Sequence, residues 1–236
     1  MENNKEKGHL HPITTAIREM YGIFSKMGYE IALGPELETE FYNFDALNVP
    51  ADHPSRDMQD TFWIKNEFSD GKKRLMRTQT SAIQIRYMEN HKPPFKIFAP
   101  GKVFRNEATD ATHEVEFFQI EGLVIDKDVS LAHLKGAIEQ FLKLYFGNDV
   151  KFRIRPSYFP FVEPGIEVDI WYRGKWVELL GAGLVHQSVL QASGIDPSIW
   201  SGFAFGMGFD RFIMAKYNID DIRLLYSGDL RFINQF

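Results

Sequence analysis

Two arginines in widely separated motifs have neighbours that could hold a nucleoside triphosphate. Arg105 follows an apolar stretch and precedes a polar loop, and Arg211 ends a glycine-rich run that leads into an apolar helix pattern. The segment 115–125 alternates in part between apolar and polar residues, which predicts a strand. Because a strand, a loop and a second strand lie side by side, Arg105 and Glu107 come next to Phe117. Two cations, a carboxylate and an aromatic ring can together bind phosphates and a purine.

These motifs resemble those of the class II aminoacyl-tRNA synthetases. Residues 104–107 and 117–122 are similar to motif 2 of that class, an arginine followed by a loop and a second strand, and residues 202–211 are similar to motif 3. Within the class, the chain is most similar to the phenylalanyl-tRNA synthetase alpha-subunit family, over about residues 11–236. Further segments that carry the resemblance are Gly34-Pro35-Glu36, residues 43–48, residues 60–63, Arg77-Thr78-Gln79-Thr80-Ser81, residues 156–161 and residues 229–232.

The chain departs from the family pattern at three positions within these motifs. Gln79 stands where the family usually has histidine, Phe118 stands within a strand that usually reads Phe-His-Gln, and Asp210 replaces the more usual glutamate. Only Gln79 is expected to contact substrate. The family usually also carries an N-terminal helical region that reaches tRNA, whereas here a polar tail, residues 1–10, leads almost directly into the catalytic domain, residues 11–236. The chain is therefore either a shortened form or a naturally minimal one.

The resemblance implies ATP-dependent activation of phenylalanine to phenylalanyl-adenylate and its transfer to tRNA(Phe). The attacking carboxylate is already ionised at neutral pH, so the protein needs cations and accurate placement rather than a general base. The resemblance places Arg105 on the α-phosphate and the amino-acid carboxylate, where a guanidinium fork suits two oxygens. It places Arg211 near the γ-phosphate, at the start of a helix whose dipole also favours anions. The alternative for either arginine is a surface salt bridge.

The remaining ATP contacts are implied by the same resemblance. Glu107 accepts from the adenine amino group, Phe117 stacks on the ring, and His113 lies near the β- and γ-phosphates. Glu178 is the acidic position near the ribose and Mg²⁺, an ion that prefers carboxylate and water oxygens. Without the resemblance, a strand phenylalanine is usually a core residue and a loop histidine is usually solvated.

For the amino acid, the resemblance implies one polar end and one aromatic end of a pocket. Phe159 and Phe161 alternate across a proline, so both rings can project from one side of an extended segment and meet a phenyl ring edge-to-face. Ala204 forms the pocket floor, although both phenylalanines could instead be ordinary core residues. The positions expected around the ammonium group are Trp63, Gln79, Ser81, Gln119 and Glu121.

Composition indicates one large globular domain. The chain has 236 residues, of which 44% are hydrophobic and 14% aromatic, and its 21 phenylalanines are most simply explained by core packing. It has no cysteine, which excludes disulfides and cysteine-bound metal and is compatible with a reducing cytoplasm. No secretory signal and no long apolar run is present, so a cytoplasmic location without membrane association is expected.

The formal net charge of −5 predicts that the chain alone binds tRNA poorly, because nonspecific affinity for nucleic acid comes mostly from neutralised phosphates. Lys151, Arg153 and Arg155 alternate with apolar residues and so share one strand face, which is either solvated or an RNA contact. The resemblance implies a large beta subunit that carries editing and tRNA contacts in an (αβ)₂ assembly. It would dock on the helix, strand and proline of residues 13–35, which resemble motif 1.

Two other functions are compatible with the same residues. A stand-alone paralogue could adenylate an amino acid without charging tRNA, and it would keep both Arg105 and Arg211. A synthetase-like regulatory module could bind amino acid or tRNA without catalysis, but the presence of both arginines and Glu107 argues against it.

Hydrophobic periodicity and turn residues predict the elements that must hold the site. Expected helices are 13–27, a short one near 41–47, 81–90, 130–147 and 207–217. Expected strands are 29–33, 96–105, 115–125, 151–155, 166–172 and 176–181, with a hairpin of 61–64 and 74–76 and a polar loop at 50–60. A strand-rich middle with flanking helices predicts an α+β fold with a mostly antiparallel sheet, in keeping with the class II synthetase catalytic fold.

Overall fold

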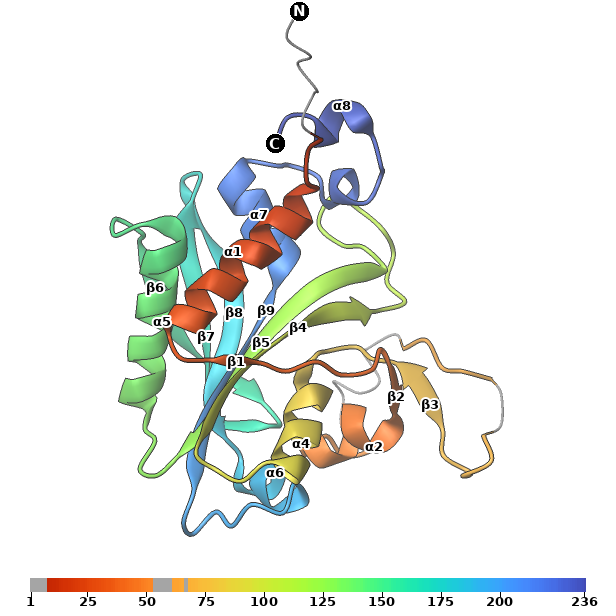
Figure 1. Ribbon diagram of the computed structural model, residues 1–236, viewed down its shortest axis with the longest axis vertical. Coiled ribbons are helices and arrows are strands. Elements are labelled where there is room, and N and C mark those ends of the chain that lie inside the picture. Colours follow the sequence, from red (N-terminus) through yellow and green to blue (C-terminus); the bar gives the residue numbers. More distant parts are fainter. Residues whose placement is uncertain (1–7, 53–60, 66–67) are drawn as a thin grey trace, which may run out of the picture.

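The computed structural model describes residues 8–52, 61–65 and 68–236, so most of the polar tail and of the loop at 50–60 lies outside the described residues. A sheet of seven strands, in the order β1-β4-β5-β9-β8-β7-β6, forms the centre of the molecule (Figure 1). Its strands are β1 (Glu30–Ile31), β4 (Phe95–Phe104), β5 (Glu116–Asp126), β6 (Phe152–Phe159), β7 (Val162–Tyr172), β8 (Lys175–Val185) and β9 (Ser201–Gly208). A separate pair, β2 (Leu37–Thr39) and β3 (Arg74–Met76), is antiparallel.

The path of the chain places the last strand in the middle of the sheet. After β5, the chain crosses to the far edge, returns through the antiparallel meander β6-β7-β8, and then inserts β9 between β8 and β5. All neighbouring strands of this sheet are antiparallel except β1 and β4, which run parallel. The insertion aligns Gln119 with Gly208 and Leu123 with Ala204. Residues about 80–90 positions apart thereby share one face of the sheet.

Three helices cover one face of the sheet: α1 (Pro12–Lys26), α5 (Leu131–Phe146) and α7 (Phe209–Tyr217) (Figure 1). The buried ring of Phe24 lies between rings from both layers, with centroid distances of 4.4 Å to Phe98, 5.1 Å to Phe141 and 5.8 Å to Phe205. Aromatic pairs at such spacings stabilise a core beyond the area they bury. Core packing therefore accounts for many of the phenylalanines.

A second hydrophobic cluster lies on the opposite face, since strand residues alternate between the two clusters. It packs under α4 (Ser81–Asn90), α6 (Gln187–Ala192) and the turn formed by α2 (Glu40–Asn43) and the 3-10 helix η1 (Asp45–Leu47). The chain ends with η2 (Ile222–Leu225) and α8 (Leu230–Ile233). Among the described residues, none of the helices combines the length and the apolar character that crossing a bilayer requires.

The α+β prediction with a mostly antiparallel sheet is confirmed. The prediction for residues 207–217 was partly wrong, because the helix begins at Phe209 and residues 201–208 form β9. This strand is paired on both sides and carries glycines and apolar residues without polar alternation, so its sequence lacks the period of a half-exposed strand. Helix α6 was not predicted, and β6, β7 and β8 extend beyond the predicted ranges. In the 61–64 and 74–76 hairpin, Trp63 forms a single bridge with Leu75.

Candidate active site

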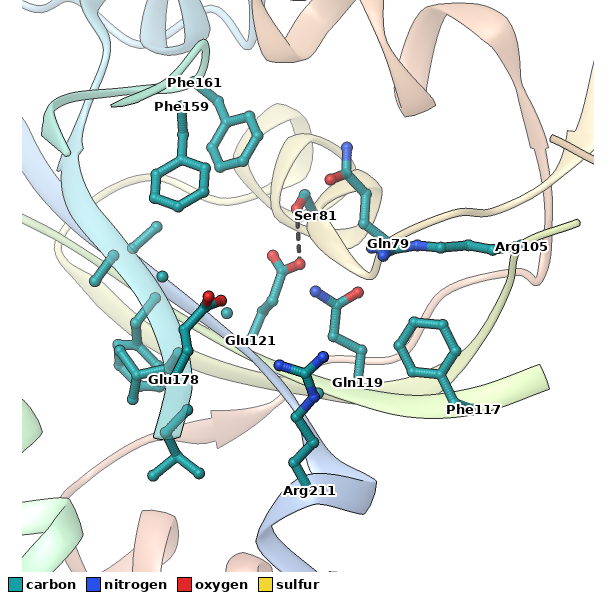
Figure 2. A pocket seen from close by; sticks show the side chains of 18 of the residues that line it. Gln79, Ser81, Arg105, Phe117, Gln119, Glu121, Phe159, Phe161, Glu178 and Arg211 are labelled. Atoms are coloured by element: carbon teal, nitrogen blue, oxygen red, sulfur yellow. Dashed lines mark hydrogen bonds between the residues drawn. The ribbon is translucent and has the colours of Figure 1, made fainter. Parts of the chain in front are cut away.

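A cavity of about 510 Å³ opens over β5, β8 and β9 on the face opposite α1 and α5. Figure 2 shows its side chains converging from the sheet, from the loop before α4 and from the start of α7. Thirteen of the fourteen predicted site residues line it: Gln79, Ser81, Arg105, Glu107, His113, Phe117, Gln119, Glu121, Phe159, Phe161, Glu178, Ala204 and Arg211. Trp63 is the exception, since it does not line the cavity and its ring lies 6.5 Å from that of Phe44, which does.

Arg105 follows the end of β4 at one end of the cavity. Its Nε donates to the Thr78 carbonyl oxygen at 3.3 Å, and its guanidinium lies 5.1 Å from the centre of the Phe117 ring. The carboxylate of Glu107 is 3.9 Å away, too far for a tight ion pair. Burial lowers the pKa of Arg105; the negative charge of Glu107 opposes this shift, and the positive charge of Arg211 adds a smaller effect in the same direction as burial. Two cations thus face one cavity and repel each other, which is the condition for binding an anion between them.

Arg211 lies in the first turn of α7 and points into the cavity between Glu178 and Gln119 (Figure 2). In the part of the chain that the structure describes, no carboxylate forms an ion pair with it. The free N–H groups at the start of a helix also face outward and favour an anion there. The position of Arg211 therefore suits a phosphate.

The neighbouring Asp210 fastens α7 to the sheet. Its buried carboxylate accepts from the Phe118 backbone N–H at 2.9 Å and from the Tyr226 hydroxyl at 3.0 Å. Because β9 ends at Gly208, this side chain supplies the acceptor that the next residue of a strand would have given to β5. Burial raises the pKa of Asp210 to about 7, while both hydrogen bonds oppose that rise. Although Asp210 also lines the cavity, both of its carboxylate oxygens are bonded to the protein, and it thereby fixes the position of the adjacent Arg211.

His113 is held at the rim of the cavity by a turn. The Asp110 carboxylate accepts from the backbone N–H groups of Thr112 at 2.6 Å and His113 at 2.8 Å, and it lies 3.0 Å from Nδ1 of His113. These hydrogen bonds hold the pKa of Asp110 well below its usual range. The ionised aspartate thus fixes both the loop and the orientation of the imidazole.

Glu178 extends an exposed carboxylate from β8 into the cavity (Figure 2). Within the described residues, no group of three or more histidines, aspartates or glutamates is placed to hold a metal ion. A single carboxylate nevertheless fits Mg²⁺, which usually keeps several waters and takes its other ligands from substrate phosphates.

The opposite end of the cavity contains a buried carboxylate. Glu121 accepts from the Ser81 hydroxyl at 2.7 Å and from the Gln84 side-chain amide, both from the first turn of α4. Burial raises the pKa of Glu121 to about 7, although these hydrogen bonds favour the ionised form. On the same strand, Oε1 of Gln119 accepts from the Thr80 backbone N–H at 3.2 Å. Among the described residues no cation forms an ion pair with Glu121, although the charge of Arg77 favours its ionised form, so the carboxylate is a strong acceptor for an ammonium group.

Phe159 and Phe161 form an aromatic wall beside this carboxylate. Their rings lie on the same side and stack on each other with centroids 5.9 Å apart and planes at 23°. The predicted extended segment was wrong in detail, because Pro160 and Phe161 form the tight turn between β6 and β7. A Cβ on Gly181 would come within 2.7 Å of the Phe159 ring, so this glycine lets the ring lie flat against β8.

Two asparagines that the sequence reasoning missed form hydrogen bonds that hold two parts of the cavity lining, the loop of Gln79 and the turn of Phe161. Asn43, fully buried, accepts from the Thr78 backbone N–H at 3.1 Å, and its own carbonyl accepts from Nε2 of Gln79 at 3.2 Å. Asn48 has a left-handed backbone with φ of 59° and donates to the Pro160 carbonyl at 2.7 Å. The sequence offered one sign of their structural role. Both asparagines end a helical turn within a short apolar segment, a position where asparagine often takes a left-handed backbone. Gln84 was also missed, although it lies three residues after Ser81 on the same helix face.

This fold and this cavity define a class II tRNA synthetase catalytic domain. The family profile described as "tRNA synthetases class II core domain (F)" matches residues 1–236, and the chain belongs to this family as an alpha subunit of the phenylalanine–tRNA ligase type. The relationship predicted from the motifs is therefore confirmed.

Phenylalanine–tRNA ligase alpha subunits from several bacteria are similar to nearly the whole chain. The protein from Alkaliphilus metalliredigens is 53% identical over 244 residues, covering 98% of this chain and 70% of the relative. That from Synechocystis is 51% identical over 232 residues, covering 98% and 68%, and that from Proteus mirabilis is 50% identical over 232 residues, covering 98% and 69%. These similarities do not favour the stand-alone paralogue.

The hydrogen bond between Asn48 and Pro160 leads to a first prediction. Asn48→Gly keeps the left-handed backbone but removes the hydrogen bond to Pro160, so the free energy of unfolding should fall by about 1 kcal/mol. Hydrogen exchange should accelerate at the amides of the turn around Phe161 and remain unchanged in the loop that Asn43 holds. Urea unfolding and hydrogen exchange with mass spectrometry measure the two effects.

The matched control for this variant is Asn218→Gly. Asn218 is also left-handed, with φ of 60°, but its side chain accepts from Tyr172 and Arg173 at the tip of the β7–β8 hairpin. The control should leave exchange around Phe161 unaltered. Equal exchange around Phe161 in the wild type and in Asn48→Gly would show that the hydrogen bond does not hold the turn.

Proposed function

We propose that this chain is the catalytic subunit of a phenylalanine–tRNA ligase: it joins phenylalanine to the α-phosphorus of ATP, releases pyrophosphate, and transfers the activated amino acid to tRNA(Phe). The observation that carries the proposal is the polarity of the cavity. Arg105 and Arg211 face one end, whereas the buried Glu121 and an aromatic wall form the other. A substrate with an ammonium group, an apolar ring and a carboxylate that reaches a polyphosphate satisfies all of these groups at once.

The cationic end is suited to ATP. Arg105 can hold the α-phosphate together with the amino-acid carboxylate, so that the nucleophile and the phosphorus meet in line. Arg211 and His113 can hold the outer phosphates. Phe117 offers its face to the adenine and Glu107 an acceptor to its amino group, while Glu178 with substrate phosphates can hold Mg²⁺, which adds positive charge when bound. The activation step does not require the protein to remove a proton, because the attacking carboxylate is already ionised.

The other end is suited to phenylalanine. Glu121 and Gln119 can accept from the ammonium group, with Ser81 orienting Glu121 through the hydrogen bond described above. Phe159 and Phe161 can pack against the phenyl ring, and Ala204 on β9 can form the floor. Gln79, which is 7% exposed, contributes a neutral amide where a histidine is usual in the family.

A beta subunit is the proposed partner, in an (αβ)₂ assembly working in the cytoplasm. The relatives are named alpha subunits, which supports a second type of chain. The segment around β1 lies at one edge of the sheet and exposes apolar side chains, Leu33 at 75% and Ile31 at 52%. Exposed apolar side chains at and just after an edge strand are typical of a protein interface.

Substitution of Arg105 tests the activation step. Arg105→Ala should lower kcat/KM for phenylalanine-dependent exchange of ATP with pyrophosphate by about a thousandfold or more, because it removes a donor from the reacting phosphate. Circular dichroism should show the fold intact. Arg231→Ala, which removes a highly exposed arginine paired with Asp229, is the control and should leave exchange unchanged. Exchange within tenfold of the wild type in Arg105→Ala would rule out the proposed role.

The raised pKa of Glu121 predicts how phenylalanine binding depends on pH. Below about pH 7 the free protein holds this carboxyl protonated, and an ammonium group can pair only with the ionised form. The KM for phenylalanine should therefore rise about tenfold per unit as the pH falls below 7 and be level above it. Exchange assays between pH 5.5 and 8.5 measure this.

Two variants distinguish the effect of Glu121 on the KM from that of Asp210, the other buried carboxyl with a pKa raised to about 7. Glu121→Gln should raise the KM and remove its pH dependence, since an amide does not titrate in this range. Asp210→Asn should keep the dependence, because Asp210 contacts Phe118 and Tyr226 rather than the ammonium end. A KM that is constant from pH 6 to 8 in the wild type contradicts the assignment.

Charging of tRNA tests the proposed partner. An apolar pocket excludes tyrosine only by crowding and by an unpaired buried hydroxyl, about 10- to 100-fold, which is too little for translation. The chain alone should therefore activate phenylalanine but charge tRNA(Phe) poorly, and a cognate beta subunit should restore charging and exclude tyrosine. Aminoacylation with radiolabelled amino acids measures both. Efficient, tyrosine-excluding charging by the chain alone would contradict the need for a beta subunit.

A further inference from the structure

The sheet face that carries the cavity continues outward over β6, β7 and β8 with an unusual set of side chains. Trp171 and Trp176 are opposite each other on β7 and β8, with ring centroids 5.2 Å apart and planes at 71°. The Arg153 guanidinium lies 4.7 Å from the centre of the Trp176 ring. Trp171 is 45% exposed and Trp176 is 36% exposed. These three residues are here named the tryptophan ledge.

The alternation of the strands places the ledge on the same face as the cavity. Asp169 is aligned with Glu178, whose carboxylate points into the cavity (Figure 2). Trp171 lies two residues after Asp169, and Trp176 lies two residues before Glu178, so both share that face and stand about 7 Å farther out. The intervening Ile170 belongs to the core under the helices. The ledge therefore forms a direct continuation of the cavity floor.

Ion pairs fix the position of Arg153 within the ledge. The buried carboxylate of Asp169 accepts from Nε of Arg153 at 2.7 Å and from Nε of Arg155 at 2.8 Å, and Arg155 also pairs with Glu167 at 2.7 Å. Within the described residues, Asp169 is the only acceptor found for Arg153, so the two terminal nitrogens of this guanidinium remain available. At the hairpin tip, the Arg173 guanidinium donates to the Asn218 side chain at 2.7 Å. A stacking surface that is already ordered loses little entropy on binding.

The chemistry of the ledge fits an unpaired nucleotide strand. Exposed indoles beside a stacked guanidinium provide flat surfaces for bases, and base–aromatic stacking is strong and tolerant of sequence. One exposed lysine, Lys151, lies two residues before Arg153 and adds positive charge next to the ledge. The acidic partners Asp169 and Glu167 offset the two arginines, so stacking is the main source of affinity and simple charge attraction is secondary.

We propose that the tryptophan ledge binds the unpaired 3′ end of tRNA, stacking its bases on Trp171 and Trp176 while the terminal ribose enters the cavity past Glu178. This inference rests on the proposed function, because only a charging enzyme must bring a nucleic-acid end to this cavity. The continuity of ledge and cavity favours RNA over a protein partner, since a polymer end has to travel from the outer surface to the activated amino acid.

The experiment uses the chain assembled with its beta subunit and a tRNA(Phe) transcript. The double variant Trp171→Ala/Trp176→Ala should lower kcat/KM for tRNA in aminoacylation by about tenfold to a hundredfold, with exchange of ATP and pyrophosphate unchanged. Trp171→Phe/Trp176→Phe retains flat rings and should recover most of the loss. Leu144→Ala is the matched surface control, because Leu144 on α5 is 47% exposed, and it should change neither assay.

A tRNA that lacks its last three nucleotides locates the effect. As a competitive inhibitor of charging, it should have the same inhibition constant for the wild type and for the double alanine variant, because it has lost the part that the ledge binds. A weaker inhibition of the variant would instead assign the ledge to the double-helical stem and overturn the proposal. A charging efficiency within twofold of the wild type in the double alanine variant would overturn it as well.

Two further outcomes separate the ledge from other functions. If the double alanine variant loses the beta subunit in size-exclusion chromatography, the ledge is a protein interface and the proposal fails. If the wild-type assembly itself shows no phenylalanine-dependent exchange, the proposed function fails, and the inference falls with it. Exchange thus reports on the catalytic proposal, while the tRNA dependence of charging reports on the ledge.

Discussion

The insertion of β9 between β5 and β8 is the constraint on which the site depends. Without it, the first turn of α7 would have no fixed position relative to β5, and the two arginines would not share a cavity. Close approach between these strands also depends on small residues, since a Cβ on Gly122 would lie 2.1 Å from the Phe205 ring and one on Gly206 would lie 3.2 Å from Cγ of Glu121. The Asp210 carboxylate then completes the β5 ladder where β9 stops. Backbone pairing thus sets the geometry that the charged groups use.

In the unliganded protein, each end of the cavity holds an ionisable group in an unfavourable environment, and the two groups have opposite charges when ionised. At one end Arg105 is desolvated next to Arg211, and at the other the carboxyl of Glu121 is buried with only a weak effect from the charge of Arg77. An anion stabilises the charged form of the first group, and an ammonium group stabilises that of the second. A zwitterionic amino acid beside a polyphosphate presents these charges in the required order. In the proposed function, orientation of the substrate therefore follows from electrostatics as well as from the shape of the aromatic wall.

The sequence predicted the features that depend on local periodicity or on motif order. Helices α1, α4 and α5 and strands β4 and β5 follow from their spacing of apolar residues, and thirteen of the fourteen proposed site residues do line the cavity. The features that were missed depend on pairing between distant residues. Asn48 and Pro160 are 112 positions apart, and the two tryptophans come together only through the register of a hairpin. Strand β9, covered on both faces, has no polar alternation to reveal it.

The hydrogen bonds of Asn43 and Asn48 have a consequence for how the pocket can diverge during evolution. Asn48 is bonded to the turn of Phe161 through the Pro160 carbonyl, whereas Asn43 holds Thr78, whose own carbonyl oxygen accepts from Arg105. Substitutions at Asn48 can therefore reshape the aromatic wall while leaving Arg105 in place, whereas substitutions at Asn43 affect both ends of the cavity. In the proposed function, a lineage can thus change its amino-acid preference through substitutions at Asn48, a residue that does not line the cavity, without altering the hydrogen bond of Arg105.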